Sequence, residues 1–279
     1  MYSLKIENLS KTYPTFKLEN VSFALEPGYI MGFIGRNGAG KTTTLKSMLK
    51  FVHPDSGHVE ICGFDINKQE FEVKNSIGFV SGLDGFCNSK KIKTVTNVTK
   101  KFFKNWDENK YQNLLKTFNL DENKLIKSLS AGMKVKYQIA LAMCHDAKLL
   151  ILDEPTSGLD PVSRDELVCL FQDYVADGEH SILFSTHITS DLEKCADYVT
   201  YIKNGKILES TDIVSFKEKY LQVSGKEQDL TDELKSKIIG LRVHNFGYEG
   251  IILSQDKNLF VNAEISKPTL EEIMVHQER

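Results

Sequence analysis

The densest group of residues that could bind a ligand or take part in a reaction is glycine-rich and ends in one lysine and two threonines. Glycines allow backbone N–H groups to point at phosphate oxygens, and a following helix N-terminus adds unpaired donors and partial positive charge. An apolar run at 29–34 precedes the group and a helix-like run follows it, which indicates a P-loop rather than a plain connecting turn. The predicted phosphate-binding residues are Gly35, Arg36, Asn37, Gly38, Ala39, Gly40, Lys41, Thr42 and Thr43. Lys41 can reach terminal phosphates as a catalytic cation, and the Thr42 hydroxyl can hold Mg²⁺.

Two adjacent carboxylates follow the apolar run at 149–152. Four consecutive apolar residues are typical of a parallel strand that is buried on both faces. The carboxyl end of such a strand is where ligands bind in open α/β sheets. Asp153 is therefore expected to hold Mg²⁺ through water, and Glu154 to polarise the water that attacks a γ-phosphate. A charged strand end that only faces solvent is the alternative, which the P-loop in the same chain disfavours.

An aromatic residue and a histidine lie near the same predicted elements. Tyr13 stands in a turn before the P-loop strand, where it can stack on adenine or pack on the surface, and the segment alone leaves both open. His187 ends the strand-like run at 181–186. An imidazole there can contact a γ-phosphate and hold Glu154 in register, although a lone histidine more often makes a structural hydrogen bond.

Strands and helices alternate along the part of the chain that must position these residues. Strands are expected at 4–9, 21–25, 29–34, 58–63, 77–80, 149–154 and 181–186, with helices at 43–50, 163–175 and 191–196. Between the strands, helical spacing is found at 94–103, 110–118 and 133–143. The aromatic residues of this insert are expected to form a local core: Phe102, Phe103, Trp106, Tyr111 and Phe118.

The last part of the chain gives a weaker pattern. An Asn-Gly dipeptide at 204–205 predicts a hairpin over 198–209. Beyond it, helices are expected at 216–221, 231–239 and 271–276, and strands at 241–243, 250–253 and 259–261. We interpret this as a small α+β appendage with no catalytic constellation.

Composition limits the classes of function. The 279 residues carry a net charge of −3, which does not suggest a nucleic-acid surface. Apolar runs are too short to cross a bilayer, and the N-terminus lacks a signal-peptide core. The expected location is cytoplasmic, with any membrane association made through a partner.

The order of the motifs resembles ABC-type ATPase subunits over residues 3–210. The discriminating motif is Leu-Ser-Ala-Gly-Met at 129–133, which resembles the family signature. The resemblance implies a P-loop NTPase (RecA-like) α/β core with an N-terminal antiparallel β-subdomain at 1–84 and 149–210, a helical subdomain at 85–148 and an accessory region at 211–279. It implies that Tyr13 stacks on adenine, that His187 is the switch histidine and that Asp160 ends the D-loop. Ser130 and Gly132 would bind the γ-phosphate of ATP held by another protomer.

Further features narrow the resemblance to ABC-2-type exporter ATPases of Gram-positive bacteria: the signature, Asn-Trp-Asp at 105–107 and Phe-Ser-Thr-His at 184–187. This implies ATP and Mg²⁺ as cofactors, a separate transmembrane permease, and export of peptides, toxins or drugs from the inner face of the membrane. The ATPase partner would be a second copy or a related subunit. Non-transport ABC ATPases of ribosomes or DNA, and a weakly hydrolysing regulatory or immunity module, remain alternatives.

Three positions depart from the family pattern, of which Ala131, in place of the first signature glycine, is a small change. Met133 replaces the usual glutamine of the signature, and Gly82 stands where the family places glutamine or an acidic residue. That residue normally contacts Mg²⁺ and the attacking water. Asp84 is close in sequence, and we hypothesise that it substitutes.

Overall fold

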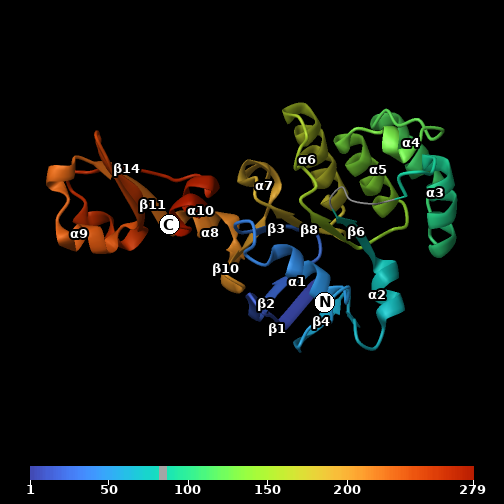
Figure 1. The fold of residues 1–279 in the computed structure, drawn as a ribbon, viewed down its shortest axis with the longest axis horizontal. Helices are drawn as coiled ribbons and strands as arrows, with labels where there is room; N and C mark the ends of the chain where they lie inside the picture. Colours follow the sequence, from blue (N-terminus) through green and yellow to red (C-terminus); the bar gives the residue numbers. More distant parts are fainter. Residues whose placement is uncertain (82–86) are drawn as a thin grey trace.

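The computed structural model describes residues 1–81 and 87–279 and arranges their strands in three sheets (Figure 1). The N-terminal sheet is antiparallel and has the order β2 (Phe16–Leu25), β1 (Leu4–Tyr13), β4 (Ser56–Ile61) and β5 (Phe64–Asp65). The central sheet has the order β10 (Lys206–Asp212), β9 (Tyr198–Lys203), β3 (Ile30–Ile34), β8 (Ser181–Thr186), β7 (Leu149–Asp153) and β6 (Ile77–Ser81). The C-terminal sheet has the order β12 (Ile239–His244), β13 (Gly247–Leu253), β11 (Tyr220–Gly225) and β14 (Glu264–Ser266).

Helices cover these sheets and form the insert. They are α1 (Lys41–Met48), α2 (Glu70–Ser76), α3 (Ile92–Thr99), α4 (Glu108–Thr117), α5 (Ala131–Met143), α6 (Pro161–Val175), α7 (Thr189–Cys195), α8 (Ile213–Glu218), α9 (Asp232–Lys237) and α10 (Leu270–Gln277). Helices α3, α4 and α5 lie together at the right of Figure 1, beyond the edge strand β6. This α/β architecture confirms the predicted fold class.

The central sheet brings the ends of β3, β7 and β8 side by side. These strands run parallel, and every residue of the three is buried. Apolar runs with no polar alternation suit strands that are covered on both faces, as expected from the sequence. The register pairs Asp153 with Ser81 on one side and with Ser185 on the other, so polar side chains meet at this edge.

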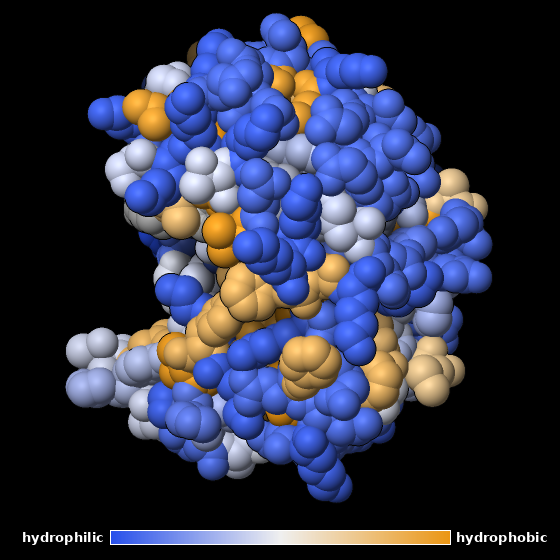
Figure 2. All heavy atoms as spheres, turned by 90° about the vertical axis from the view of Figure 1, so that its right-hand side faces the viewer, coloured by the Kyte–Doolittle hydropathy of each residue, from blue (hydrophilic) through white to orange (hydrophobic). Residues whose placement is uncertain are grey.

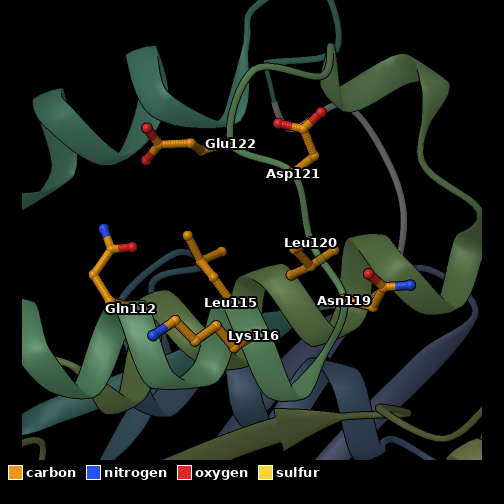
Figure 3. Close-up of a pocket in the computed structure, with 7 residues that line it drawn as sticks. All are labelled: Gln112, Leu115, Lys116, Asn119, Leu120, Asp121 and Glu122. Atoms are coloured by element: carbon orange, nitrogen blue, oxygen red, sulfur yellow. The ribbon is translucent and has the colours of Figure 1, made fainter.

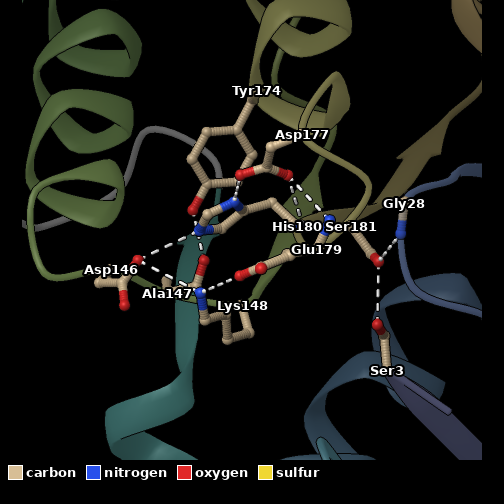
Figure 4. A network of polar contacts seen from close by, with 10 residues as sticks. All are labelled: Ser3, Gly28, Asp146, Ala147, Lys148, Tyr174, Asp177, Glu179, His180 and Ser181. Carbon is tan, nitrogen blue, oxygen red and sulfur yellow. Dashed lines mark hydrogen bonds and ion pairs between the residues drawn. The ribbon is translucent and has the colours of Figure 1, made fainter. Parts of the chain in front are cut away.

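The opposite ends of β7 and β8 are held by a polar network (Figure 4). The Nδ1 atom of His180 lies 2.5 Å from Asp177 and its Nε2 atom lies 3.2 Å from Asp146. The Tyr174 hydroxyl donates to the carbonyl of Ala147. These contacts connect the turn before β8 to the turn before β7, and they fix the starting points of the strands that carry the polar residues at the other edge.

The helical insert packs around a buried hydroxyl cluster. Thr96 Oγ1 lies 2.8 Å from the Tyr111 hydroxyl and 2.9 Å from the Tyr137 hydroxyl. Burial raises the pKa of Tyr111 to about 12. Tyr111 and Phe118 are buried as predicted, but Phe102 is 71% exposed, so its assignment to the local core was wrong. Phe102 ends the short 3-10 helix η1 (Lys100–Phe102), where the chain turns away from that core.

The C-terminal region, residues 211–279, shares a hydrophobic core with the central sheet. Phe216, Tyr220 and Leu270 belong to the same buried apolar cluster as Tyr201 of β9. The Tyr201 hydroxyl also donates to Glu278 Oε1 at 2.7 Å. The prediction of an α+β region is correct in kind, but the contacts of α10 with α7 and of α8 with β9 were not foreseen.

Two of the predicted C-terminal elements were wrong. The helix predicted at 216–221 ends at Glu218, and β11 begins at Tyr220. Phe216 and Tyr220 are spaced as on one helical face, but the second faces the core from a strand. The strand predicted at 259–261 follows a 3-10 helix, η4 (Ser254–Leu259), and the strand that pairs with β11 is β14.

Candidate nucleotide-binding site

Backbone packing explains the glycines of the P-loop, which connects β3 to α1. Gly40 has φ +117° at the N-terminus of α1, and a Cβ atom there would lie 2.9 Å from Cζ of Phe16. A Cβ atom on Gly35 would collide with the carbonyl oxygen of Ile202 in β9. The positive φ of Gly40 and the close approach of β9 to Gly35 therefore require glycine at these two positions.

Lys41 is folded into the loop that precedes it. Its ammonium group donates to the carbonyl of Gly35 at 2.7 Å and lies 3.5 Å from Glu154 Oε1. The lysine is only 6% exposed, which few lysines are unless they have such partners. The structure thus pairs the P-loop lysine with Glu154, the second of the two carboxylates at the end of β7.

Two hydroxyl groups from different elements hold the Asp153 carboxylate. The Thr42 hydroxyl donates to Asp153 Oδ2 at 2.9 Å, and the Ser185 hydroxyl donates to Oδ1 at 3.0 Å. Asp153 is 7% exposed, so these bonds offset the cost of burying its charge. Ser185 was not among the predicted site residues, and the signal that could have found it is its place opposite Asp153 on the neighbouring strand.

Glu154 faces a different direction from Asp153 because its backbone turns. Its φ is +54°, and its N–H donates to the carbonyl of Ser185 at 2.9 Å. Glu154 Oε2 lies 2.7 Å from Nδ1 of His187 and accepts from the His187 N–H at 3.3 Å. The ends of β7 and β8 therefore place the predicted catalytic carboxylate against the predicted switch histidine.

A cavity of about 730 Å³ opens above these residues. Its lining residues are Tyr13, Pro14, Thr15, Phe16, Arg36, Asn37, Gly38, Gly40, Lys41, Thr42, Thr43 and Glu154. Tyr13 is 37% exposed at the end of β1 and so remains accessible for stacking. The turn 14–16 was not predicted as part of the site; its contribution follows from the β1–β2 hairpin, which the sequence pattern did not resolve.

The oxygen groups at the base of this cavity fit Mg²⁺. A hydroxyl and a carboxylate that are 2.9 Å apart offer the hard oxygen ligands that this ion prefers. Residues 1–81 and 87–279 contain no cluster of three or more His, Cys, Asp or Glu side chains that could hold a metal by themselves. Thr42 and Asp153 are two such oxygen ligands, and Mg²⁺ usually takes one or two protein ligands together with phosphate and water.

The signature and D-loop residues lie elsewhere in the chain. Ser130 caps α5, where its hydroxyl accepts from the Met133 N–H at 3.2 Å, and Asp160 caps α6. The N–H of Ser163 lowers the pKa of Asp160 by donating to it. A Cβ atom on Gly132 would lie 2.7 Å from Leu159, so the two motifs touch each other. None of the three predicted residues lines the P-loop cavity as far as the structure describes it.

The proposed substitute Asp84, and Gly82 with it, fall outside the described residues. A second depression lies on the insert, between α4 and the segment that follows it (Figure 3). Its lining combines Lys116 with the carboxylates Asp121 and Glu122, which repel anions and give no phosphate cradle. The P-loop cavity is therefore the nucleotide site that the described residues support.

Comparison with known proteins gives one consistent result. A family model described as ABC transporter matches residues 18–157. The bacitracin transport ATP-binding protein BcrA of Bacillus licheniformis is 32% identical over 89% of this chain and 83% of its own length. The lantibiotic transport ATP-binding protein SrtF of Streptococcus pyogenes is 33% identical over 74% of this chain and 89% of its own.

A solved structure has the same fold. It is titled as the ATP-binding subunit of an ABC transporter, with a TM-score of 0.70 and 25% identity over 77% of this chain and 91% of that one. Within the residues that the structure describes, none of the helices has the length and apolar character needed to span a bilayer.

Proposed function

Because the chain belongs to the ABC transporter family, we propose that it is the ATP-hydrolysing subunit of a membrane exporter whose substrates are peptides, toxins or drugs. Two of its relatives are named for transport of bacitracin and of a lantibiotic, both antimicrobial peptides. This similarity supports the substrate class. The permease that would carry the substrate is a separate partner in this proposal.

The convergence of four polar side chains at the ends of three parallel strands carries the proposal, and two of them, Lys41 and Glu154, line the cavity. Lys41 comes from the P-loop after β3, Asp153 and Glu154 from the end of β7, and His187 from the end of β8. In the proposed site, Tyr13 stacks on adenine, and the N–H groups of the P-loop surround the phosphates.

Each residue at the base has a distinct task in this proposal. Thr42 and, through water, Asp153 would hold Mg²⁺, which would neutralise charge on the phosphate oxygens. Lys41 turns from Glu154 to the terminal phosphate. Glu154 then accepts a proton from water as the water oxygen bonds to the γ-phosphorus, the bond to the β,γ-bridging oxygen breaks, and ADP and phosphate leave. Its contact with His187 fixes the carboxylate for that proton transfer.

The position of the signature supports a site shared between two chains. Ser130, Gly132 and Asp160 stand apart from the P-loop cavity of their own chain. We propose that a second copy supplies them, so that the Ser130 hydroxyl and the Gly132 N–H contact the γ-phosphate across the interface. A related ATPase subunit in place of the second copy is an outcome that mixing experiments can reveal.

An apolar surface next to β6 suits the permease. Phe51 after α1 is 58% exposed and Phe71 on α2 is 69% exposed, and the ring of Phe51 lies 5.4 Å from that of Phe79 in β6. Exposed apolar groups of this kind mark interaction sites. On the face in Figure 2, apolar atoms gather in a hollow across the middle of the molecule, between two more hydrophilic halves.

Phosphate release from ATP by the purified chain tests the enzymatic part. Activity is expected with Mg²⁺ and is expected to disappear in Lys41→Ala. Lys46→Ala is the matched control because Lys46 is exposed on the same helix and should keep full activity. Equal activity in both variants would refute the assigned site. Sensitivity of cells to amphipathic peptides after loss of the chain tests the export part.

A further inference from the structure

The segment at 88–106 has a charge unlike that of the chain as a whole. It contains six lysines and no aspartate or glutamate, whereas the whole chain has a net charge of −3. The lysines are Lys90, Lys91, Lys93, Lys100, Lys101 and Lys104. The segment comprises α3, the short helix η1 and the residues that flank them.

Helix α3 has one buried face and one exposed face. Ile92, Val95 and Thr96 are buried against the insert. On the outer side, Val98 is 53% exposed, and Phe102, just beyond the helix end, is 71% exposed. Exposed Lys101 and Lys104 lie within two residues of this exposed phenylalanine.

Most of these lysines also lack a counter-charge. Lys93 pairs with Glu122 at 3.2 Å and Lys100 with Glu108 at 3.5 Å. In the part of the chain that the structure describes, the remaining four form no ion pair: Lys90, Lys91, Lys101 and Lys104. Free cations therefore stand at both ends of the outer face.

A neighbouring segment places two further lysines at the start of α3, close in sequence to the carboxylates Asp121 and Glu122, of which Glu122 pairs with Lys93. Lys91 forms a β-bridge with Leu125, and the Lys127 N–H donates to the carbonyl of Asn88 at 3.0 Å. This pairing brings exposed Lys124 and Lys127 beside Lys91. In Figure 2 the part of the surface over α3 and α4 is mostly hydrophilic, with isolated apolar side chains.

We propose that the outer face of α3 and η1 binds the anionic headgroup surface of the membrane. The proposal rests on the proposed function, since the permease would bring this face to the bilayer. Lysines are attracted to acidic lipids, and Phe102 with Val98 can enter the boundary between headgroups and acyl chains. Lysines around an exposed aromatic ring match this layered surface, which takes the cations at the headgroups and the ring at the boundary beneath them.

Vesicle flotation with the purified chain tests this inference without any permease. The chain is expected to float with vesicles of equal parts phosphatidylglycerol and phosphatidylcholine, and not with phosphatidylcholine alone. Each lysine near an acidic surface is expected to change partitioning about fivefold. Lys101→Gln/Lys104→Gln should thus weaken binding by about 25-fold, and Phe102→Ser should weaken it separately.

Matched controls use exposed residues on other faces. Lys68→Gln/Lys235→Gln removes two exposed lysines, and Phe246→Ser removes a phenylalanine that is 93% exposed. Both are expected to bind vesicles like the unchanged chain. The proposal is overturned if the control variants lose as much vesicle binding as the α3 variants, or if the unmutated chain does not bind acidic vesicles. So does a Lys101→Gln/Lys104→Gln chain that floats normally but fails to bind its permease, because the surface would then recognise an acidic protein segment.

ATP hydrolysis by the same preparations separates this proposal from the preceding one. These variants lie outside the nucleotide cavity and should hydrolyse ATP at the unchanged rate. A variant that loses vesicle binding but still hydrolyses ATP supports the lipid-binding proposal and leaves the enzymatic one unaffected. An unmutated chain that floats with vesicles but never hydrolyses ATP would refute the enzymatic proposal alone.

Discussion

Glu154→Gln should change nucleotide affinity and turnover in opposite directions. The carboxylate lies 3.5 Å from the Lys41 ammonium and 2.7 Å from His187. It therefore neutralises the cation that a γ-phosphate needs, and it also repels that phosphate. Glutamine keeps the size and the hydrogen-bonding oxygen but removes the charge and the proton acceptor.

The separation of the ion pair sets the scale of the affinity change. Two unit charges 3.5 Å apart interact by about 1 kcal/mol at the dielectric constant of water and by about 5 kcal/mol at an effective value of 20. The Glu154 side chain is 24% exposed, so solvent brings the result toward the lower figure. A gain of about 1–2 kcal/mol predicts ATP binding that is roughly 5- to 30-fold tighter. Loss of the general base predicts a turnover that is about 10²- to 10⁴-fold slower.

Equilibrium binding of ATP with Mg²⁺ and release of phosphate measure the two effects in one preparation. Glu179→Gln is the control, because Glu179 is an exposed carboxylate beyond the opposite end of the central sheet (Figure 4). It should change neither quantity. Unchanged or weaker ATP binding by Glu154→Gln would refute the role of Glu154 as the counter-charge of Lys41, and normal turnover would remove it from catalysis.

Three further changes test other parts of the account. Tyr13→Ala should weaken ATP binding by about 1–3 kcal/mol while Tyr13→Phe keeps it, as measured by the dissociation constant, if the ring stacks on adenine. Burial raises the pKa of Asp177, but the N–H groups of the turn before β8 outweigh it and lower the pKa to about 2. The ionised carboxylate therefore stabilises the folded form above the usual aspartate pKa, and this stabilisation is lost as pH falls toward 2. In Asp177→Asn, the urea concentration at the unfolding midpoint should decrease less between pH 5 and pH 2.5 than in the unmutated chain. Tyr201→Phe removes the bond to Glu278 and should cost about 1.5–3 kcal/mol, seen as faster hydrogen exchange in α10 while β7 is unchanged.

Local patterns were enough to predict most of the nucleotide site. The glycines of the P-loop and the carboxylates after β7 are specified by spacing that phosphate chemistry demands, and apolar runs identify the strands that carry them. The ion pair between Lys41 and Glu154 could not be predicted in this way. It depends on the parallel register that brings β3, β8 and β7 together, which the sequence of each strand alone does not contain.

Contacts that are distant in sequence account for the parts that were missed. Ser185 belongs to the site because of its register with Asp153. Phe102 has the composition of a core residue and helical spacing, but η1 turns it outward. In the C-terminal region, pairing with β13 and β14 makes the segment from Tyr220 a strand, and short apolar runs cannot distinguish that outcome from a helix.

Mixing two inactive variants tests most directly whether ATP is hydrolysed between two chains. Lys41→Ala disables the P-loop, and Ser130→Ala disables the signature. In a mixed pair, the intact P-loop of one chain faces the intact Ser130 of the other, so phosphate release should return to about half the unmutated rate in those pairs. A mixture that stays as inactive as each variant alone would contradict the shared site between two copies of this chain.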